Sequence, residues 1–289
     1  MGEKGRSWSL GLAGLLAPIT LWLGLFFLVP LLIILIFSFG KSSIYGGGVE
    51  LGFNPGNYLR VFEPLYLEVV VRTIVIAFFN TVFCLLLGYP LAYFITFKGG
   101  RWKNALILLV MIPFWTSLLL RSYAWVIILG GENGIANRAL RFLGITDEPL
   151  TLIFTPGAVT MGLVYSYLPF MILPLYAALE KFDARLKEAA KDLGASRWQT
   201  FWRVTFPISK PGIIAGSILV FIPSAGEFVI PDLLGGSQTV FTGNLIRQQF
   251  LQARDWAFGS ALSVMLAMLL LAAIMFYIRR VGTEKLEGV

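Results

Sequence analysis

The sequence predicts an all-α membrane protein with six transmembrane helices. Of its 289 residues, 57% are hydrophobic and only 13% are charged, whereas soluble domains carry about a quarter charged residues. A spanning helix needs roughly 20 mainly apolar residues, and six runs qualify. They lie at about 12–39, 69–97, 104–129, 152–179, 210–233 and 257–278. We therefore expect a single transmembrane domain that covers residues 1–289.

The first apolar run and the positions of the basic residues orient the chain. The run follows Lys4 and Arg6, is too long for a signal-peptide core and is not followed by a small-residue cleavage site. We expect it to remain as an uncleaved span. With the amino terminus inside, fifteen of the 23 Lys and Arg residues fall on the inner side, as the preference of these residues for cytoplasmic loops requires. Both termini are therefore predicted to be cytoplasmic.

The composition excludes several classes of function. The chain has no histidine, which removes histidine metal sites, Ser-His-Asp triads and histidine acid–base catalysis. No G-x-x-x-x-G-K-[ST] loop for a nucleotide occurs. The net charge of +7 is spread over a largely apolar chain and does not indicate nucleic-acid binding. The one cysteine, Cys84, cannot form an intramolecular disulfide. We expect no enzyme, no metal and no cofactor in this chain.

The most densely charged connection, at about 180–209, predicts a helix, a glycine turn and a second helix. In DARLKEAAKDLG, apolar residues recur at i, i+3, i+4 and i+7, which is typical of an amphipathic helix. Asp183 is placed to cap its start, and Gly194 to end it in a left-handed conformation. Ser196 can cap the second helix, before Pro207 and Pro211 redirect the chain into the fifth span.

This connection resembles the EAA loop of permeases from type I ABC importers. The family pattern is E-A-A, three residues, G, nine residues, I, one residue, L-P, and the spacing is kept throughout. Valine and phenylalanine replace the isoleucine and the leucine, and both are apolar. The matching residues are Glu188, Ala189, Ala190, Gly194, Val204, Phe206 and Pro207. From the pattern alone, the alternative is a basic hairpin that tryptophans anchor on lipid headgroups.

The resemblance implies a type I importer permease fold in the bacterial inner membrane, in contact with membrane lipid. The segment at about 180–209, here named the coupling loop, would dock on a separate dimer of ATPase subunits, which would bind ATP and Mg. Glu188 would contact the ATPase and Gly194 would permit the sharp turn. A second permease, expected to be a different chain, would complete the pair. A periplasmic or lipid-tethered binding protein would meet the outer connections, at about 40–68, 130–151 and 234–256.

Three further stretches resemble the permeases of spermidine/putrescine importers. They are IPFWTSLLLRSYAW at 112–125, VYSYLPFMILPLYAAL at 164–179 and GEFVIPDLLGG at 226–236. The resemblance implies polyamine import by alternating access. Importers for iron(III), opines and other small solutes share parts of these motifs and are the alternative. An ATP-independent secondary transporter would predict an internal repeat, which is not evident.

Two charges inside the spans are candidates for function, because charged residues at membrane depth are costly. Arg121 lies 17 residues after Asn104, and Glu227 lies 17 residues after Lys210. A rise of 1.5 Å per residue places each roughly 25 Å from the inner end of its span. At matching depth they could form an ion pair that fixes helix packing or gates the path, rather than binding substrate.

The other interpretation assigns Glu227 and Asp232 to the ammonium groups of a polyamine. Pro223, Gly226 and Pro231 should interrupt the helix here, and irregular backbone at membrane depth occurs where it lines protein or a watery cavity. Asp232 could instead lie at the outer interface. Aromatic rings could add about 1 kcal/mol each through cation–π contacts, although each could equally be a packing or interfacial residue. The candidates are Trp115, Tyr123, Trp125, Tyr165 and Tyr167.

Overall fold

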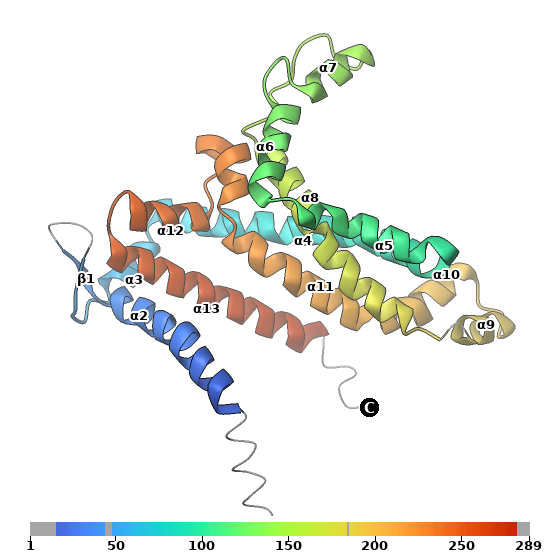
Figure 1. Ribbon diagram of the computed structural model, residues 1–289, viewed down its shortest axis with the longest axis horizontal. Helices are drawn as coiled ribbons and strands as arrows, with labels where there is room; N and C mark the ends of the chain where they lie inside the picture. The colour runs from blue at the N-terminus through green and yellow to red at the C-terminus, as the bar shows by residue number, and fades with distance from the viewer. Residues whose placement is uncertain (1–15, 44–47, 184, 282–289) are drawn as a thin grey trace, which may run out of the picture. The chain divides into compact units, whose positions relative to one another are not determined.

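The structure is a computed structural model that describes residues 16–43, 48–183 and 185–281. Within these ranges, five single helices are long and apolar enough to cross a membrane, and one bent pair of helices could make a sixth span (Figure 1). This agrees with the predicted all-α fold. Residues 1–15 and 282–289, with Lys4, Arg6 and both termini, lie outside the described ranges, so the orientation stays a prediction.

The chain divides into two compact units, and the first comprises Met1–Tyr66 and Ile246–Met268. Its first described helix runs from Leu16 to Ser38 and contains the π-turn η1 (Gly24–Leu28) and α2 (Val29–Ser38). A short hairpin follows, in which β1 (Lys41–Ser42) pairs antiparallel with β2 (Val49–Glu50), and then α3 (Gly56–Val61). Arg60 of α3 forms an ion pair with Asp255, with Nη1 2.7 Å from Oδ2.

The second unit, Leu67–Leu245 with Leu269–Val289, holds most of the membrane-spanning helices. Its core lies between α8 and α11, where two glycines let the helices approach closely. An added Cβ at Gly212 would lie 2.7 Å from the Pro174 carbonyl oxygen, and one at Gly216 would lie 2.7 Å from Met171 Sδ.

Several helices have residues in both units. In chain order the elements from α4 onward are α4 (Pro64–Lys98), η2 (Gly100–Trp102), α5 (Lys103–Met111), η3 (Ile112–Trp115), α6 (Leu118–Leu129), α7 (Ile135–Phe142), α8 (Pro156–Glu180), α9 (Arg185–Asp192), α10 (Arg197–Thr200), η4 (Phe201–Thr205), α11 (Phe206–Gly226), η5 (Pro231–Gly235), η6 (Gly236–Gln238), α12 (Thr242–Leu251) and α13 (Trp256–Val281).

The third span is not the straight helix that the sequence predicts over 104–129. Gly100–Trp115 and Leu118–Leu129 are bent by 90°, because Thr116 and Ser117 adopt ψ angles of 147° and 142° and cannot continue a helix. Pro113, in the last turn before the bend, also has no amide hydrogen for a helical bond. The depth calculated for Arg121 from a straight helix is therefore wrong.

The fifth span begins earlier and ends earlier than predicted. Helix runs continuously from Arg197 to Gly226, so the predicted redirection of the chain at Pro207 and Pro211 is wrong. Pro207 is the second residue after the π-turn η4, and the wider backbone of a π-turn accommodates a nearby proline that lacks an amide donor. The predicted interruption near the outer end is confirmed, since α11 ends at Gly226 and Glu227 is extended.

Candidate functional site

The break after α11 places a buried carboxyl group inside the second unit. Glu227 is 7% exposed, and its Oε1 accepts hydrogen bonds from the amides of Phe228 and Val229 at 3.0 and 2.8 Å. The hydroxyl of Tyr167, on α8, donates to Oε2 at 2.6 Å. Three donors therefore fix this carboxyl group at the point where the helix stops.

Buried amide side chains hold both flanks of the break. Asn80, on α4, donates from Nδ2 to Ser224 Oγ at 2.7 Å, one turn before the break, and both side chains are buried. After the break, Asn244 donates to the Phe228 carbonyl at 2.7 Å and to Asp232 Oδ1 at 3.2 Å. Asn80 was not predicted from the sequence, although an amide within an apolar run is the kind of residue that marks such a contact.

Within the part of the chain that the structure describes, Arg121 forms no ion pair with Glu227. The ion pairs found there include Arg60–Asp255, Arg72–Glu68 and Lys103–Glu180. The Nε and Nη1 atoms of Arg121 are buried and have no hydrogen-bond partner within that part of the chain. The guanidinium carbon lies 5.8 Å from the ring centroid of Phe114. Phe114 in turn contacts Phe170, with centroids 4.8 Å apart, and Phe170 lies 6.1 Å from Tyr167. Two aromatic rings, those of Phe114 and Phe170, thus connect the guanidinium to Tyr167, the hydrogen-bond partner of Glu227.

The other predicted path residues occupy several different environments. Trp125 and Tyr165 meet edge to face, with ring centroids 5.7 Å apart. Trp115 and Tyr123 are 77% and 53% exposed, and Asp232 is exposed. The structure therefore brings Tyr167 to Glu227 and Trp125 to Tyr165, but it does not gather all the candidates into one site.

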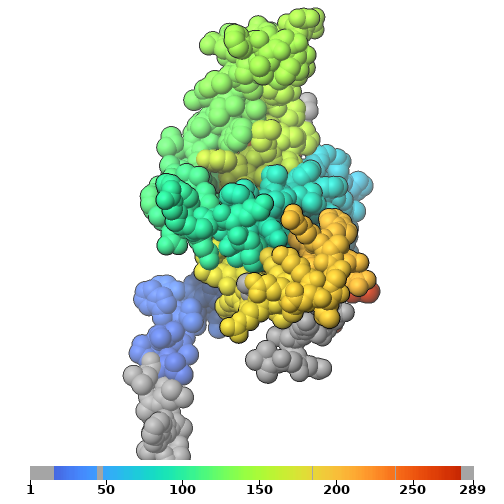
Figure 2. Space-filling view, turned by 90° about the vertical axis from the view of Figure 1, so that its right-hand side faces the viewer, coloured from blue at the N-terminus to red at the C-terminus, as the bar shows by residue number. Residues whose placement is uncertain are grey.

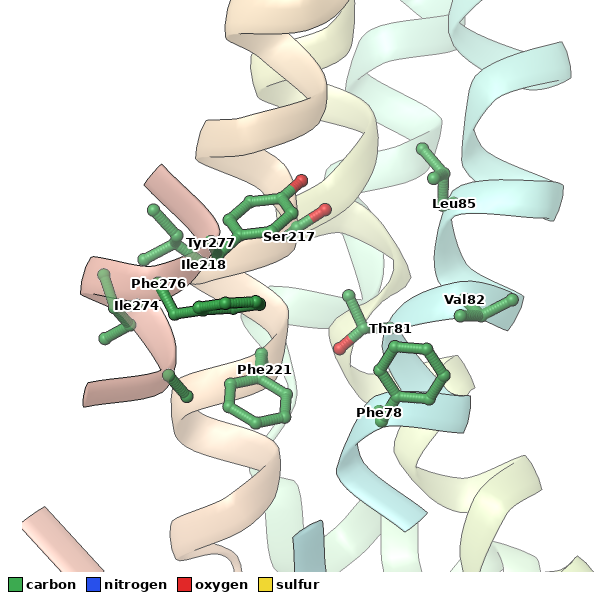
Figure 3. A pocket seen from close by; sticks show the side chains of 11 residues that line it. Phe78, Thr81, Val82, Leu85, Ser217, Ile218, Phe221, Ile274, Phe276 and Tyr277 are labelled. Atoms are coloured by element: carbon green, nitrogen blue, oxygen red, sulfur yellow. The ribbon is translucent and has the colours of Figure 1, made fainter. Parts of the chain in front are cut away.

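An apolar groove of about 380 Å³ lies elsewhere in the second unit. Figure 3 shows side chains of α4 on one side of this space and side chains of α11 and α13 on the other. The lining residues are Phe78, Thr81, Val82, Leu85, Ser217, Ile218, Phe221, Ala273, Ile274, Phe276 and Tyr277. Because this lining contains no carboxylate, it offers no counter-charge to an ammonium group.

The coupling loop has the predicted helix, glycine turn and second helix. The Arg185 amide donates to Asp183 Oδ1 at 2.9 Å at the start of α9, and Gly194 has a left-handed φ of +80°. Ser196 caps α10 by accepting a hydrogen bond from the Gln199 amide at 3.2 Å, and the Gln199 side chain accepts from the Ser196 amide in return. These three predictions are confirmed.

No described residue covers the outward face of α9. Leu186 and Leu193 are 46% and 88% exposed, and no described residue of α9 is buried. The segment from α9 to η4, in yellow and gold, faces the viewer in Figure 2. After α9, Phe201 packs edge to face on Tyr89 of α4, with centroids 5.6 Å apart. The loop is thus attached to the second unit on one side and open on the other.

Lys187 makes the inward contacts of α9. Its Nζ lies 2.9 Å from the ring centroid of Phe97, 4.8 Å from that of Tyr93 and 5.1 Å from that of Phe182. Burial, together with repulsion from Lys191, lowers the pKa of Lys187 to about 8. The contacts with Tyr93 and Phe97 were not predicted, because these two rings lie on α4, far from Lys187 along the chain.

Comparison with known protein families decides the class of this chain. The family described as the inner membrane component of binding-protein-dependent transport systems matches residues 15–286. The chain belongs to this family. Membership of this family places the chain in the inner membrane, as a component of a transport system that depends on a binding protein. The predicted localisation and the expectation of a transport subunit rather than an enzyme are confirmed by this membership.

Individual relatives within the binding-protein-dependent family narrow the comparison. The chain is 42% identical over 268 residues to the spermidine/putrescine transport system permease protein PotB of Escherichia coli (strain K12), covering 92% of this chain and 97% of the relative. It is 43% identical over 261 residues to PotB of Haemophilus influenzae, covering 89% and 90%. The predicted resemblance to spermidine/putrescine permeases is therefore confirmed as a sequence relationship.

Solved structures support the fold. A bacterial ABC transporter involved in the import of the acidic polysaccharide alginate matches with a TM-score of 0.76 and 18% identity, over 97% of each chain. The alginate transporter in complex with a pentasaccharide-bound periplasmic protein matches with a TM-score of 0.74 and 20% identity, over 97% of this chain and 96% of the other. The predicted importer permease fold is confirmed.

Proposed function

We propose that this chain is the permease subunit of an ABC importer that moves polyamines of the spermidine/putrescine class into the cytoplasm. The observation that carries the substrate class is the buried carboxyl group of Glu227, fixed at a break in a membrane helix beside the ring of Tyr167. A carboxylate and an aromatic ring are the groups that bind a protonated amine. Identity of 42% to PotB of E. coli over nearly its whole length supports the same class.

Energy is supplied by a separate pair of ATPase subunits, which bind ATP and Mg. The coupling loop is the contact, and its exposed α9 face supports this role. Glu188, Ala189 and Ala190 meet the ATPase, Gly194 allows the turn, and Pro207 stands at the entry to α11. ATP-driven closure of the ATPase pair moves the loop and opens the path by alternating access.

Two further partners complete the importer. A second permease, which we expect to be a different chain, forms the other half of the path. A periplasmic or lipid-tethered binding protein delivers the polyamine to the outer connections. Asp232, Trp115, Tyr123, Trp125 and Tyr165 are candidate contacts along the path, and Glu227 is the central one.

The test begins with purification of the tagged chain from its native membranes in mild detergent, with mass spectrometry of the proteins that accompany it. An ATPase and a second permease in stoichiometric amounts are expected. The assembly is then reconstituted in liposomes with its binding protein, and uptake of labelled spermidine is followed with and without ATP. Excess unlabelled putrescine should compete, whereas iron(III) or an opine should not. ATP-independent uptake by the chain alone would contradict the proposal.

A further inference from the structure

Two complementary charged groups are held apart in the second unit. Arg121 is half-buried, and its Nε and Nη1 atoms have no hydrogen-bond partner among the described residues. Glu227 is 7% exposed and receives only neutral donors, from Tyr167 and from two backbone amides. A buried charge without a counter-charge is costly, so each group is an attractive partner for the other or for a ligand.

The contacts between these groups give the guanidinium a defined place near the carboxyl group. The guanidinium of Arg121 lies near the ring of Phe114, which packs on Phe170. Phe170 in turn packs on Tyr167, the residue that donates to Glu227. An arginine side chain with several rotatable bonds can therefore approach the carboxyl group without leaving this cluster.

The backbone beside Arg121 provides a hinge. Thr116 and Ser117 are extended between η3 and α6, where the two helical pieces meet at 90°. Hinges are usually a few residues between elements that absorb a change in φ and ψ. A modest rotation of α6 about these two residues would carry Arg121, in its first turn, toward or away from the cluster.

We propose that Arg121 is a tethered cation that competes with the transported cation for Glu227. In the structure described here the guanidinium makes no ion pair with Glu227, whose buried carboxyl group accepts hydrogen bonds from neutral donors. Its negative charge is then available to a substrate ammonium group when the path opens. When α6 rotates so that Arg121 moves toward the cluster, the guanidinium forms an ion pair with the carboxyl group of Glu227 and displaces the substrate. Arg121 is then a positioning residue for release, which explains why an arginine lies beside the path of a cation. This inference rests on the proposed polyamine function.

The test measures substrate retention and transport rate separately, in the assembled importer with its binding protein. If the Arg121 guanidinium occupies Glu227 for part of the time, it lowers the apparent affinity of the complex for spermidine in proportion to that fraction. Arg121→Met removes this competitor and should raise the amount of labelled spermidine that the purified complex retains by about threefold or more. Because release is slower, maximal uptake at saturating binding protein should fall by about the same factor. Arg121→Lys keeps the charge and should resemble the wild type in both measurements.

The controls separate competition from a structural role. Arg101→Met removes an exposed arginine that stacks on Trp102, and it should change neither measurement. If Arg121→Met does not assemble with its partners, Arg121→Gln, which keeps polar atoms without the charge, should give the same increase in retention and decrease in rate. Retention that is unchanged or reduced in the neutral variants would overturn the inference. If the wild-type importer takes up no spermidine with ATP, the proposed function fails instead.

Discussion

The hydroxyl of Tyr167 lies 2.6 Å from Oε2 of Glu227 and donates a hydrogen bond to it. Tyr167 is on α8 and Glu227 follows α11, the two helices that pack closely through Gly212 and Gly216. A tight helix pair therefore sets the position of the carboxyl group. This rigidity suits the binding role that we propose for Glu227, because a mobile carboxylate would be free to find other partners.

Replacing Glu227 with Gln should abolish uptake and leave assembly intact. The glutamine oxygen can still accept from the amides of Phe228 and Val229, so the break keeps its shape, but the negative charge is lost. A hydrogen bond to a charged group contributes about 1.5–3 kcal/mol, and its loss lowers affinity by more than about tenfold. Spermidine uptake and co-purification of the ATPase measure the two effects.

The matched control for this substitution is Glu63→Gln, which removes an exposed carboxylate before α4. Its uptake should equal that of the wild type. Unchanged uptake in Glu227→Gln would show that the carboxyl group has only a structural role. A loss of ATPase co-purification in the same variant would show that the break had collapsed.

Replacing Gly194 with Ala should weaken coupling without blocking the turn sterically. An added Cβ at this position meets no atom within 4 Å, but the φ of +80° is unfavourable for alanine. The strain of about 1 kcal/mol lowers the population of the docked loop by roughly fivefold. The ratio of spermidine transported to ATP hydrolysed should therefore fall. Gly52→Ala, where the added Cβ also meets nothing and φ is ordinary, should leave the ratio unchanged.

The sequence predicted the coupling loop well because its structure is local. Asp183, Gly194 and Ser196 act on their own neighbours in the chain, through a cap, a left-handed turn and a second cap. The same is true of the interruption at Glu227, which comes directly after Gly226 and lies between Pro223 and Pro231. Such features depend on a few consecutive residues, which a sequence displays directly.

The sequence did not predict features that depend on tertiary packing or on a local departure from α-helical backbone. A hydropathy run cannot distinguish one straight helix from two pieces that meet at 90°, so the depth of Arg121 was wrong. The π-turn before Pro207 has no sequence marker apart from the proline itself. The Tyr167–Glu227 and Asn80–Ser224 contacts join residues 60 and 144 positions apart, and only the packed helices bring them together.

The pKa of Lys187 predicts how the stability of the coupling loop depends on pH. Burial and Lys191 lower this pKa to about 8, below the ordinary value of about 10.4. Between these values the folded state binds fewer protons than the unfolded state, so stability should rise with pH across this window. Lys187→Met should lack this rise. Thermal unfolding of both proteins at pH 7.5 and 9.5, followed by the fluorescence of Trp198 and Trp202, measures this change in stability. A difference in stability between wild type and Lys187→Met that is the same at both pH values would contradict the prediction.

The Arg60–Asp255 contact of the first unit predicts acid sensitivity. Burial alone would raise the pKa of Asp255, but hydrogen bonds from Ser42, the Phe258 amide and Arg60 outweigh it and hold that pKa below its ordinary value. Because the folded pKa is lowered, this contact stabilises the protein above about pH 4 and loses its effect as the pH falls further. Arg60 also lies 4.0 Å from the ring centroid of Phe258, which keeps the guanidinium in place.

Replacing Asp255 with Asn should therefore lower stability at neutral pH by about 1–2 kcal/mol, since charged hydrogen bonds become neutral ones. Thermal unfolding of the purified protein at pH 7 and at pH 3 measures the difference from the wild type. This difference should be smaller at pH 3 than at pH 7, because the stabilisation that comes from the lowered pKa of Asp255 is lost progressively as the pH falls below the unfolded value. Glu63→Gln, which removes an exposed carboxylate in the same unit, should show no such convergence. A difference that is equal at both pH values would mean that the carboxylate charge does not contribute to stability.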